Sequence, residues 1–203
     1  MILLIKRFFL LLAWIIVSPL IALTWLGILL GTEEVFLFCG GLLSLIPGKP
    51  GSLLRVAYYI TILKQISPDI YIGFGSFFSK RAVQIGQYAS IGAYCVIGSV
   101  KIGRETLIAS HVSIPSGRHQ HGNAEDAEGK WETMDVSTVE IGSKSWIGEA
   151  AVIMANVGNN CIIGGGSVVV RDIPDNSVAV GNPAKPIKQR KSEEGGTLSH
   201  KQA

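Results

Sequence analysis

The chain carries little charge. Of its 203 residues 16% are Asp, Glu, Lys or Arg, against about 25% in an ordinary soluble protein. A disordered chain would be polar and highly charged, so this composition excludes intrinsic disorder as its main character. The net charge is only +3 and is scattered, whereas a nucleic-acid binder shows a basic patch or stripe, so no nucleic-acid partner is expected. The cysteines number three and are widely spaced, which excludes a disulfide scaffold.

Long apolar runs stand where the charge is missing. From Phe8 to Thr32 there are 25 residues without a charge, enough for a helix to cross a ~30 Å hydrocarbon core. The next uncharged run, Val35 to Gly48, has 14 residues, so the sequence leaves open whether it crosses or only dips. A cleaved signal peptide fits less well, because its apolar core normally has about 7–15 residues. We predict an α-helical membrane hairpin over residues 1–48, in contact with membrane lipid.

The charges that flank these runs predict an orientation. Lys6 and Arg7 precede the first run, Lys49 follows the second, and two glutamates lie between them. The positive-inside rule then places both ends of the hairpin on the cytoplasmic side of the inner membrane, with the rest of the chain. Residues 49–67 mix apolar, basic and tyrosine side chains, which indicates an interfacial helix, a capping helix or both.

After Pro68 an aliphatic residue recurs with a spacing that is mostly six. There are 14 such positions, and at nine of them glycine follows. A helix cannot keep a period of six on one face, and a two-sided strand alternates every two residues. The period is typical of a hexapeptide β-helix, in which the aliphatic side chain points inward while the glycine and a small fifth residue lie where the backbone bends. We predict an all-β domain, a parallel β-helix of hexapeptide repeats over residues 68–186, with Cys95 and Cys161 as buried thiols.

The repeat disappears between Ile114 and Ile141. This loop, residues 115–140, holds two of the four histidines, His119 and His121. A loop of this length in a compact repeat domain is usually functional. His111 lies within the repeat instead, and we interpret it as a structural or surface residue. Residues 187–203 are expected to form a flexible basic and polar tail.

Motifs along residues 68–190 resemble the hexapeptide-repeat acyltransferases, in the branch that O-acetylates sugars such as galactosides, maltose and colanic-acid units. Besides the repeat, they are Ser116-Gly117-Arg118-His119 in the loop, Trp146-Ile147-Gly148, residues 164–169, and Gly181-Asn182-Pro183-Ala184-Lys185. The resemblance implies the left-handed form of the β-helix. The loop departs from the family pattern, because an arginine precedes His119 and a second histidine follows, so the choice between His119 and His121 stays open.

The resemblance also implies a chemistry. The co-substrate would be acetyl-CoA, with no metal, and one loop histidine would act as general base on a sugar hydroxyl. Glu132 or Asp135 would orient the imidazole, while Arg118 and Trp131 would contact the substrate. The residues implied for acetyl-CoA binding are Trp146, Gly165, Gly166, Ser167, Lys185 and Lys188. The implied assembly is a homotrimer with acyl-CoA between subunits, and the implied acceptor is a lipid-linked polysaccharide precursor at the membrane.

Two alternatives remain at this point. His111, His119 and His121 resemble the three imidazoles of the trimeric γ-type carbonic anhydrases, which hold zinc, although two of them lie in a loop and not on repeat faces. A non-catalytic trimeric membrane scaffold is the other alternative. The dense polar loop argues against a scaffold, which has no need of one.

Overall fold

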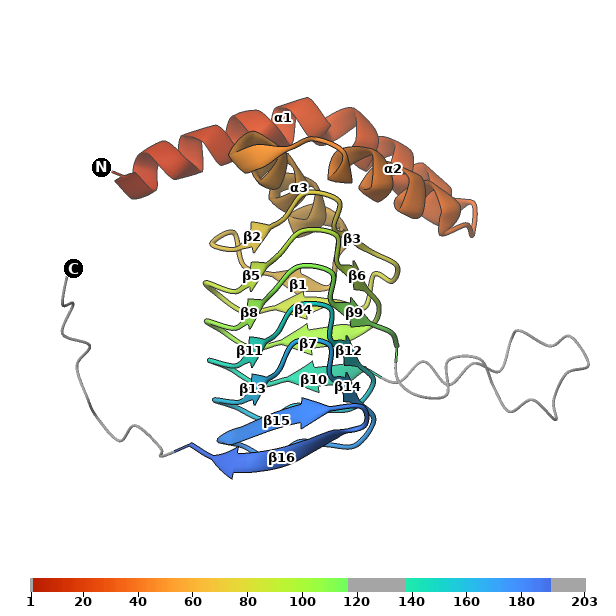
Figure 1. The fold of residues 1–203 in the computed structure, drawn as a ribbon. Coiled ribbons are helices and arrows are strands. Elements are labelled where there is room, and N and C mark those ends of the chain that lie inside the picture. The colour runs from red at the N-terminus through yellow and green to blue at the C-terminus, as the bar shows by residue number, and fades with distance from the viewer. Residues whose placement is uncertain (1, 117–137, 191–203) are drawn as a thin grey trace, which may run out of the picture.

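Three helices lie at one end of a long parallel β-helix in the computed structural model (Figure 1). It describes residues 2–116 and 138–190, with backbone alone for residues 2–5. The helices are α1 (Ile2–Leu29), α2 (Glu34–Ser44) and α3 (Gly48–Ile62). The β-strands follow from Gln65 onward and stack away from the helices.

The strands form three sheets, which we name faces A, B and C. Face A contains β1 (Gln65–Ile66), β4 (Gln84–Ile85), β7 (Val100–Ile102) and β10 (Val139–Ile141). Face B contains β2 (Tyr71–Ile72), β5 (Ser90–Ile91), β8 (Leu107–Ile108), β11 (Trp146–Ile147), β13 (Ile162–Ile163), β15 (Ser177–Gly181) and β16 (Ala184–Gln189). Face C contains β3 (Phe77–Phe78), β6 (Val96–Ile97), β9 (Ser113–Ile114), β12 (Val152–Ile153) and β14 (Val168–Val169). Only the β15–β16 pair is antiparallel among these strands, and together they make about five turns of the left-handed parallel β-helix.

The predicted inward positions form the core of the β-helix. Each of the fourteen is at most 3% exposed, namely Ile72, Phe78, Ile85, Ile91, Ile97, Ile102, Ile108, Ile114, Ile141, Ile147, Ile153, Val157, Ile163 and Val169. Cys95 and Cys161 are buried as expected, and burial raises the pKa of both thiols. Each aliphatic side chain stacks on its counterpart in the next coil, so no coil could bury its core alone.

The sequence pattern predicts the repeat glycines at backbone bends, but in the structure these glycines have a different role. A Cβ atom added to Gly92 would lie 2.6 Å from the carbonyl carbon of Ala109 in the next coil. The corner residues with positive φ are mostly not glycine: they are Tyr88, Tyr94, Glu105, His111, Lys144, Ala150, Asn160 and Asn176. Glycine is therefore required by the close approach of stacked backbones, while other residues adopt the left-handed conformation.

Helix α3 covers the first coil through a buried arginine. The Arg55 side chain is fully buried, and its guanidinium group donates to the carbonyls of Leu43 (2.9 Å), Ile46 (2.8 Å) and Ile72 (3.0 Å). Burial lowers the pKa of Arg55, and these carbonyls replace the water that the cation has lost. Since the three carbonyls belong to the end of α2 and to β2, one side chain ties the helices to the β-helix.

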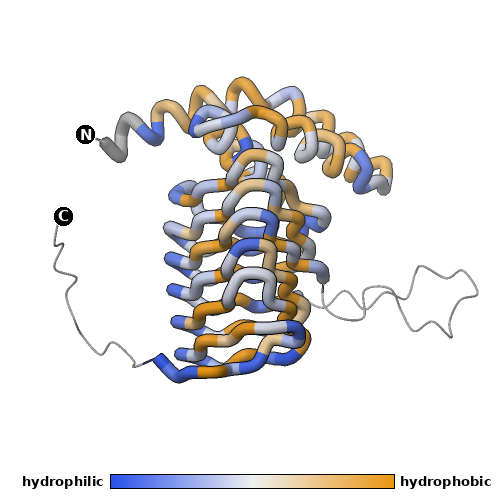
Figure 2. The backbone as a smooth tube through the Cα atoms, viewed as in Figure 1, coloured by the Kyte–Doolittle hydropathy of each residue, from blue (hydrophilic) through white to orange (hydrophobic). Residues whose placement is uncertain are grey.

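Helix α1 lies crosswise over the end of the β-helix (Figures 1 and 2). A stripe along it, containing Ala13, Val17, Ile21 and Thr24, is buried, while its other sides expose large apolar residues. From Lys6 to Leu29 it is long and apolar enough to cross a membrane by length and composition. Helix α2 has 11 residues and rises only about 16 Å, about half of a hydrocarbon core.

Candidate functional site

The loop expected to hold the general base leaves the β-helix at the edge between faces C and A, because it joins β9 to β10. Arg118, His119, His121, Trp131 and Glu132 all lie outside the described residues. Both ends of the loop are held by Ser99. Its backbone N–H donates to the Ser116 hydroxyl at 2.9 Å, and its own hydroxyl lies 2.9 Å from that of Thr138.

Trp146 occupies an outward position on face B. It lies on β11 between Leu107 of β8 and Ile162 of β13, and half of its surface is exposed. The strand alternation that buries Ile147 turns the indole outward. An exposed, flat apolar side chain in this position is available to an extended ligand that runs along face B.

The predicted glycine segment forms the corner between β13 and β14, at the edge of faces B and C. Gly165 and Gly166 are exposed, and Gly166 has φ +67° with no atom within 4 Å of an added Cβ. Ser167 is 1% exposed, and its hydroxyl accepts a hydrogen bond from the Gly181 N–H at 3.1 Å. The Ser167 side chain therefore braces the last turn, and the corner offers a ligand mainly an open glycine backbone.

Lys185 and Lys188 lie on β16, which adds to the far edge of face B. Both are exposed, and neither forms an ion pair within residues 2–116 and 138–190. The order β11, β13, β15, β16 spans three strand spacings, about 14 Å. The structure thus brings the six residues predicted for acetyl-CoA into one strip of face B and its edge with face C, and the strip ends in two exposed lysines.

His111 lies on the same edge, which the sequence did not indicate. Its ring is exposed and stacks on that of Tyr94, with centroids 5.2 Å apart and an interplanar angle of 12°. Both are positive-φ corners, as is Gly166. Each comes three residues after a buried isoleucine of face B, so counting three residues on from those isoleucines would have placed His111 on this edge.

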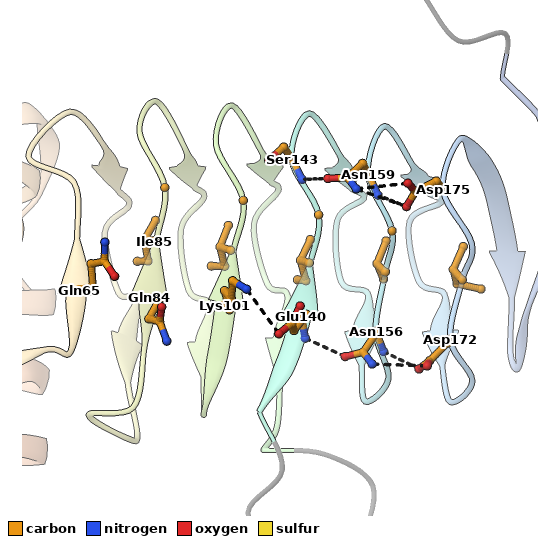
Figure 3. A pocket seen from close by; sticks show the side chains of 18 residues that line it. Gln65, Gln84, Ile85, Lys101, Glu140, Ser143, Asn156, Asn159, Asp172 and Asp175 are labelled. Carbon is orange, nitrogen blue, oxygen red and sulfur yellow. Dashed lines mark hydrogen bonds and ion pairs between the residues drawn. The ribbon is translucent and has the colours of Figure 1, made fainter.

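Face A has a groove of about 660 Å³, and none of the predicted site residues that the structure describes lines it (Figure 3). Two ladders of polar side chains run along it. Asn156 accepts from the Glu140 N–H at 2.8 Å and Asn159 from the Ser143 N–H at 2.8 Å, while Asp172 and Asp175 do the same one coil further on. These side chains satisfy backbone donors where face A has only isolated bridges, so we interpret the groove as structural.

Within the described part of the chain, no group of three or more His, Cys, Asp or Glu side chains is placed to hold a metal ion. His111 is the one histidine of the three-imidazole alternative that falls in this part.

Comparison with known sequences finds acetyltransferases. An Escherichia coli K12 protein, WbbJ, provisionally named a lipopolysaccharide biosynthesis O-acetyl transferase, is 37% identical over 131 residues, covering 60% of this chain and 64% of that protein. A Saccharomyces cerevisiae protein, YJL218W, provisionally named an acetyltransferase, is 34% identical over 142 residues, covering 67% of this chain and 68% of that protein. The chain therefore spans slightly less than two thirds of the first of these relatives. No family model matches the chain.

Solved structures share the fold. A maltose O-acetyltransferase from Clostridium difficile superimposes with a TM-score of 0.58 at 25% identity, covering 81% of this chain and 89% of that one. A galactoside acetyltransferase in complex with coenzyme A superimposes with a TM-score of 0.59 at 23% identity, covering 80% and 88%. At 23% identity, the similarity to the galactoside acetyltransferase shows a shared fold alone.

Proposed function

The chain belongs to the hexapeptide-repeat acetyltransferases, and from this premise we propose that it transfers an acetyl group from acetyl-CoA to a sugar hydroxyl. The observation that carries the proposal is the strip of face B formed by Trp146, the Gly165–Gly166 corner and the two lysines of β16. The maltose and galactoside enzymes are named for acetyl transfer to sugars, and the Escherichia coli relative for lipopolysaccharide biosynthesis, which supports a sugar acceptor here.

The strip fits acetyl-CoA chemically. Trp146 is half exposed, and Gly166 leaves open surface where a side chain would stand. Lys185 and Lys188 are exposed and suit pairing with the phosphates of the nucleotide end. When bound, acetyl-CoA supplies a thioester, whose carbonyl carbon is the point of attack.

A loop histidine would make the acceptor reactive. A neutral imidazole, with an ordinary pKa of about 6.5, takes the proton of the sugar hydroxyl while its oxygen bonds to the acetyl carbon. The carbon–sulfur bond breaks, and the imidazolium returns the proton to the departing sulfur. We assign this role to His119 or His121, with Glu132 orienting the ring and Arg118 and Trp131 contacting the sugar.

The active unit we propose is a homotrimer. The loop starts at the edge between faces C and A, whereas the strip lies on face B and its edge with face C. The two edges are separated by the width of face C, so a neighbouring subunit can bring its loop to this strip. Outward side chains on faces B and C include Leu107, Ile162, Val96 and Val152, which are apolar and suit subunit contact.

The acceptor we propose is a lipid-linked polysaccharide precursor at the cytoplasmic face of the inner membrane. The apolar N-terminal helix supports membrane association, and Lys6, Arg7 and Lys49 support placement on the cytoplasmic leaflet, whose anionic lipids attract basic residues. Holding enzyme and acceptor on one surface raises their effective concentration. The comparisons find acetyltransferases, which favours this function over the zinc enzyme and the scaffold.

The test is acetyl-CoA turnover by the full chain purified in detergent, with soluble sugars and extracted membrane glycolipids as acceptors. We expect acceptor-dependent turnover that falls by about 10²–10⁴-fold in either His119→Ala or His121→Ala. His200→Ala, at the histidine near the C-terminal end of the sequence, is the matched control and should retain turnover. Absence of both CoA binding and acceptor-dependent turnover in a folded trimer would contradict the proposal.

A further inference from the structure

The helical layer, by which we mean α1 and α2, consists mostly of apolar residues (Figure 2), and many of their side chains are exposed. Ile16 is 66% exposed and Leu29 81%, and Ile15, Leu26, Leu30 and Phe38 are exposed as well. An apolar surface of this kind marks contact with a membrane or a partner. Because α1 is apolar all round, it differs from an amphipathic surface helix and suits immersion in hydrocarbon.

Both ends of α1 are fastened to the same coil of the β-helix. Near its start, the Lys6 ammonium lies 2.9 Å from the Asp69 carboxylate, just before β2. Just beyond its end, the Glu33 carboxylate lies 2.7 Å from the Arg81 guanidinium, after β3. Asp69 and Arg81 both belong to the first coil, so the helix is held across that coil from one edge to another.

The middle of α1 is fastened as well. The Trp14 indole N–H donates to the Thr61 hydroxyl at 3.1 Å, and the hydroxyls of Thr24 and Tyr58 lie 2.8 Å apart. Thr61 and Tyr58 belong to α3, which Arg55 ties to β2. The helical layer and the first coil are therefore joined along the whole length of α1.

This arrangement is incompatible with a membrane-spanning α1. Residues 6–29 rise about 36 Å, so a spanning helix would place its two ends at opposite membrane surfaces. The first coil contacts both ends and would then lie in the hydrocarbon core, together with Asp69, Arg81 and the exposed Lys80. Charged side chains and irregular backbone are both strongly disfavoured there.

We propose that the helical layer lies in the plane of an anionic lipid leaflet, immersed on one side only, with the β-helix axis along the membrane normal. Residues 2–83 carry seven basic and three acidic residues, and two of the acidic residues, Glu33 and Asp69, are paired. Exposed cations at Arg7, Lys49 and Lys64 then face anionic headgroups. This inference rests on the membrane association proposed above and changes its form from a crossing hairpin to a one-sided layer.

The experiment measures depth along α1 in the full chain, reconstituted in vesicles of phosphatidylethanolamine and phosphatidylglycerol. Spin labels are placed singly at Phe9→Cys, Ile16→Cys and Leu29→Cys, all exposed positions. The native cysteines are all buried and should stay unlabelled. We expect the labels at residues 9 and 16, which lie on one side of α1, at one depth, whereas a spanning helix would place Ile16 about 10 Å deeper than Phe9. The latter profile would overturn the inference and leave membrane association standing.

Sidedness gives a second readout. A membrane-impermeant maleimide should label Arg7→Cys and Glu34→Cys from the same side of the vesicle, and labelling from opposite sides would overturn the inference. Arg81→Glu breaks the ion pair with Glu33 and should change the depth of the label at residue 29. Adding Glu33→Arg to the same chain forms the pair with its charges exchanged and should restore the original depth. Failure of the protein to float with vesicles would remove the membrane location itself, while acetyl transfer to soluble sugars would still test the proposed chemistry separately.

Discussion

Ser99 illustrates how much a small residue can do in this fold. It lies on the edge between faces C and A, is 1% exposed, and bonds to Ser116 at one end of the loop and Thr138 at the other. Ser76 on the edge between faces B and C is equally buried and bonds only within the β-helix. The two serines therefore share a structural role, but only Ser99 also positions the ends of the loop.

Ser99→Ala should lower acetyl transfer by about tenfold, or ~1.4 kcal/mol of barrier, because the loop ends lose one shared bond. Ser76→Ala should lower the melting temperature about as much as Ser99→Ala does, and it should leave acetyl transfer near the wild-type rate. The measurement is turnover and thermal unfolding of both variants, with Ser99→Thr as the conservative rescue. Equal losses of activity in the two alanine variants would show that Ser99 has no separate positioning role.

At the scale of elements, α1 depends on an ion pair that titrates. The hydrogen bond from Lys6 is the largest cause that lowers the pKa of Asp69 below its usual value, and Arg7 and Gln87 contribute in the same direction. A carboxyl group whose pKa is lower in the folded state stabilises that state above its unfolded pKa of about 3.9. This stabilisation is lost as the pH falls through the lowered value.

Acidification below about pH 4 should therefore loosen the start of α1 before the β-helix unfolds. Amide hydrogen exchange along α1, measured as the pH is lowered, checks this. Asp69→Asn should remove the pH-dependent part of the exchange at the start of α1. Exchange at the start of α1 that still rises with acid in Asp69→Asn would contradict the assignment to Asp69.

The sequence predicts the β-helix well because its core residues recur at a short, regular spacing along the chain. The period of six identifies fourteen inward residues that are all buried, and the same period locates Cys95 and Cys161. The placement of α1 could not be predicted, since a long apolar run has the same composition whether it crosses a membrane or lies along it. Its ties join residues 63 and 48 positions apart, Lys6 with Asp69 and Glu33 with Arg81, and no local pattern shows such pairs.

The same limit applies to the candidate site. Trp146 and the glycine segment follow from motifs, but their alignment with β16 depends on the strand order of face B. The motif predicts Ser167 as a cofactor contact, and it does not predict that the Ser167 hydroxyl accepts a hydrogen bond from the Gly181 N–H. That bond depends on the turn that leads into β16, which the six-residue period does not describe.

At the scale of the whole molecule, face A differs from faces B and C in its outward side chains. Face A presents Gln84, Lys101 and Glu140, whereas face B presents Leu107 and Trp146. Polar side chains suit contact with water, and the apolar row on face B suits contact with another subunit. The residues that differ in polarity lie between the buried isoleucines. They do not pack in the core, so the core does not restrict which residue types stand there.

Leu107→Lys should convert a homotrimer to single chains, because it buries an unpaired charge in the proposed contact. Light scattering coupled to size exclusion in detergent measures the mass of the protein component. Lys101→Ala on face A is the control and should keep the wild-type mass. A trimer that survives Leu107→Lys unchanged would move the subunit contact away from face B.

The coils between the helices and the loop fix the distance from the helical end to the point where the loop leaves the β-helix. Three coils separate α3 from the loop that follows β9, and stacked strands are about 4.8 Å apart, so the loop leaves about 14 Å from the helical end. Parallel coils stretch very little, which makes this height a fixed property of the chain. A hydroxyl presented at a different distance from the bilayer would miss the site, so coil number would select acceptors by their reach.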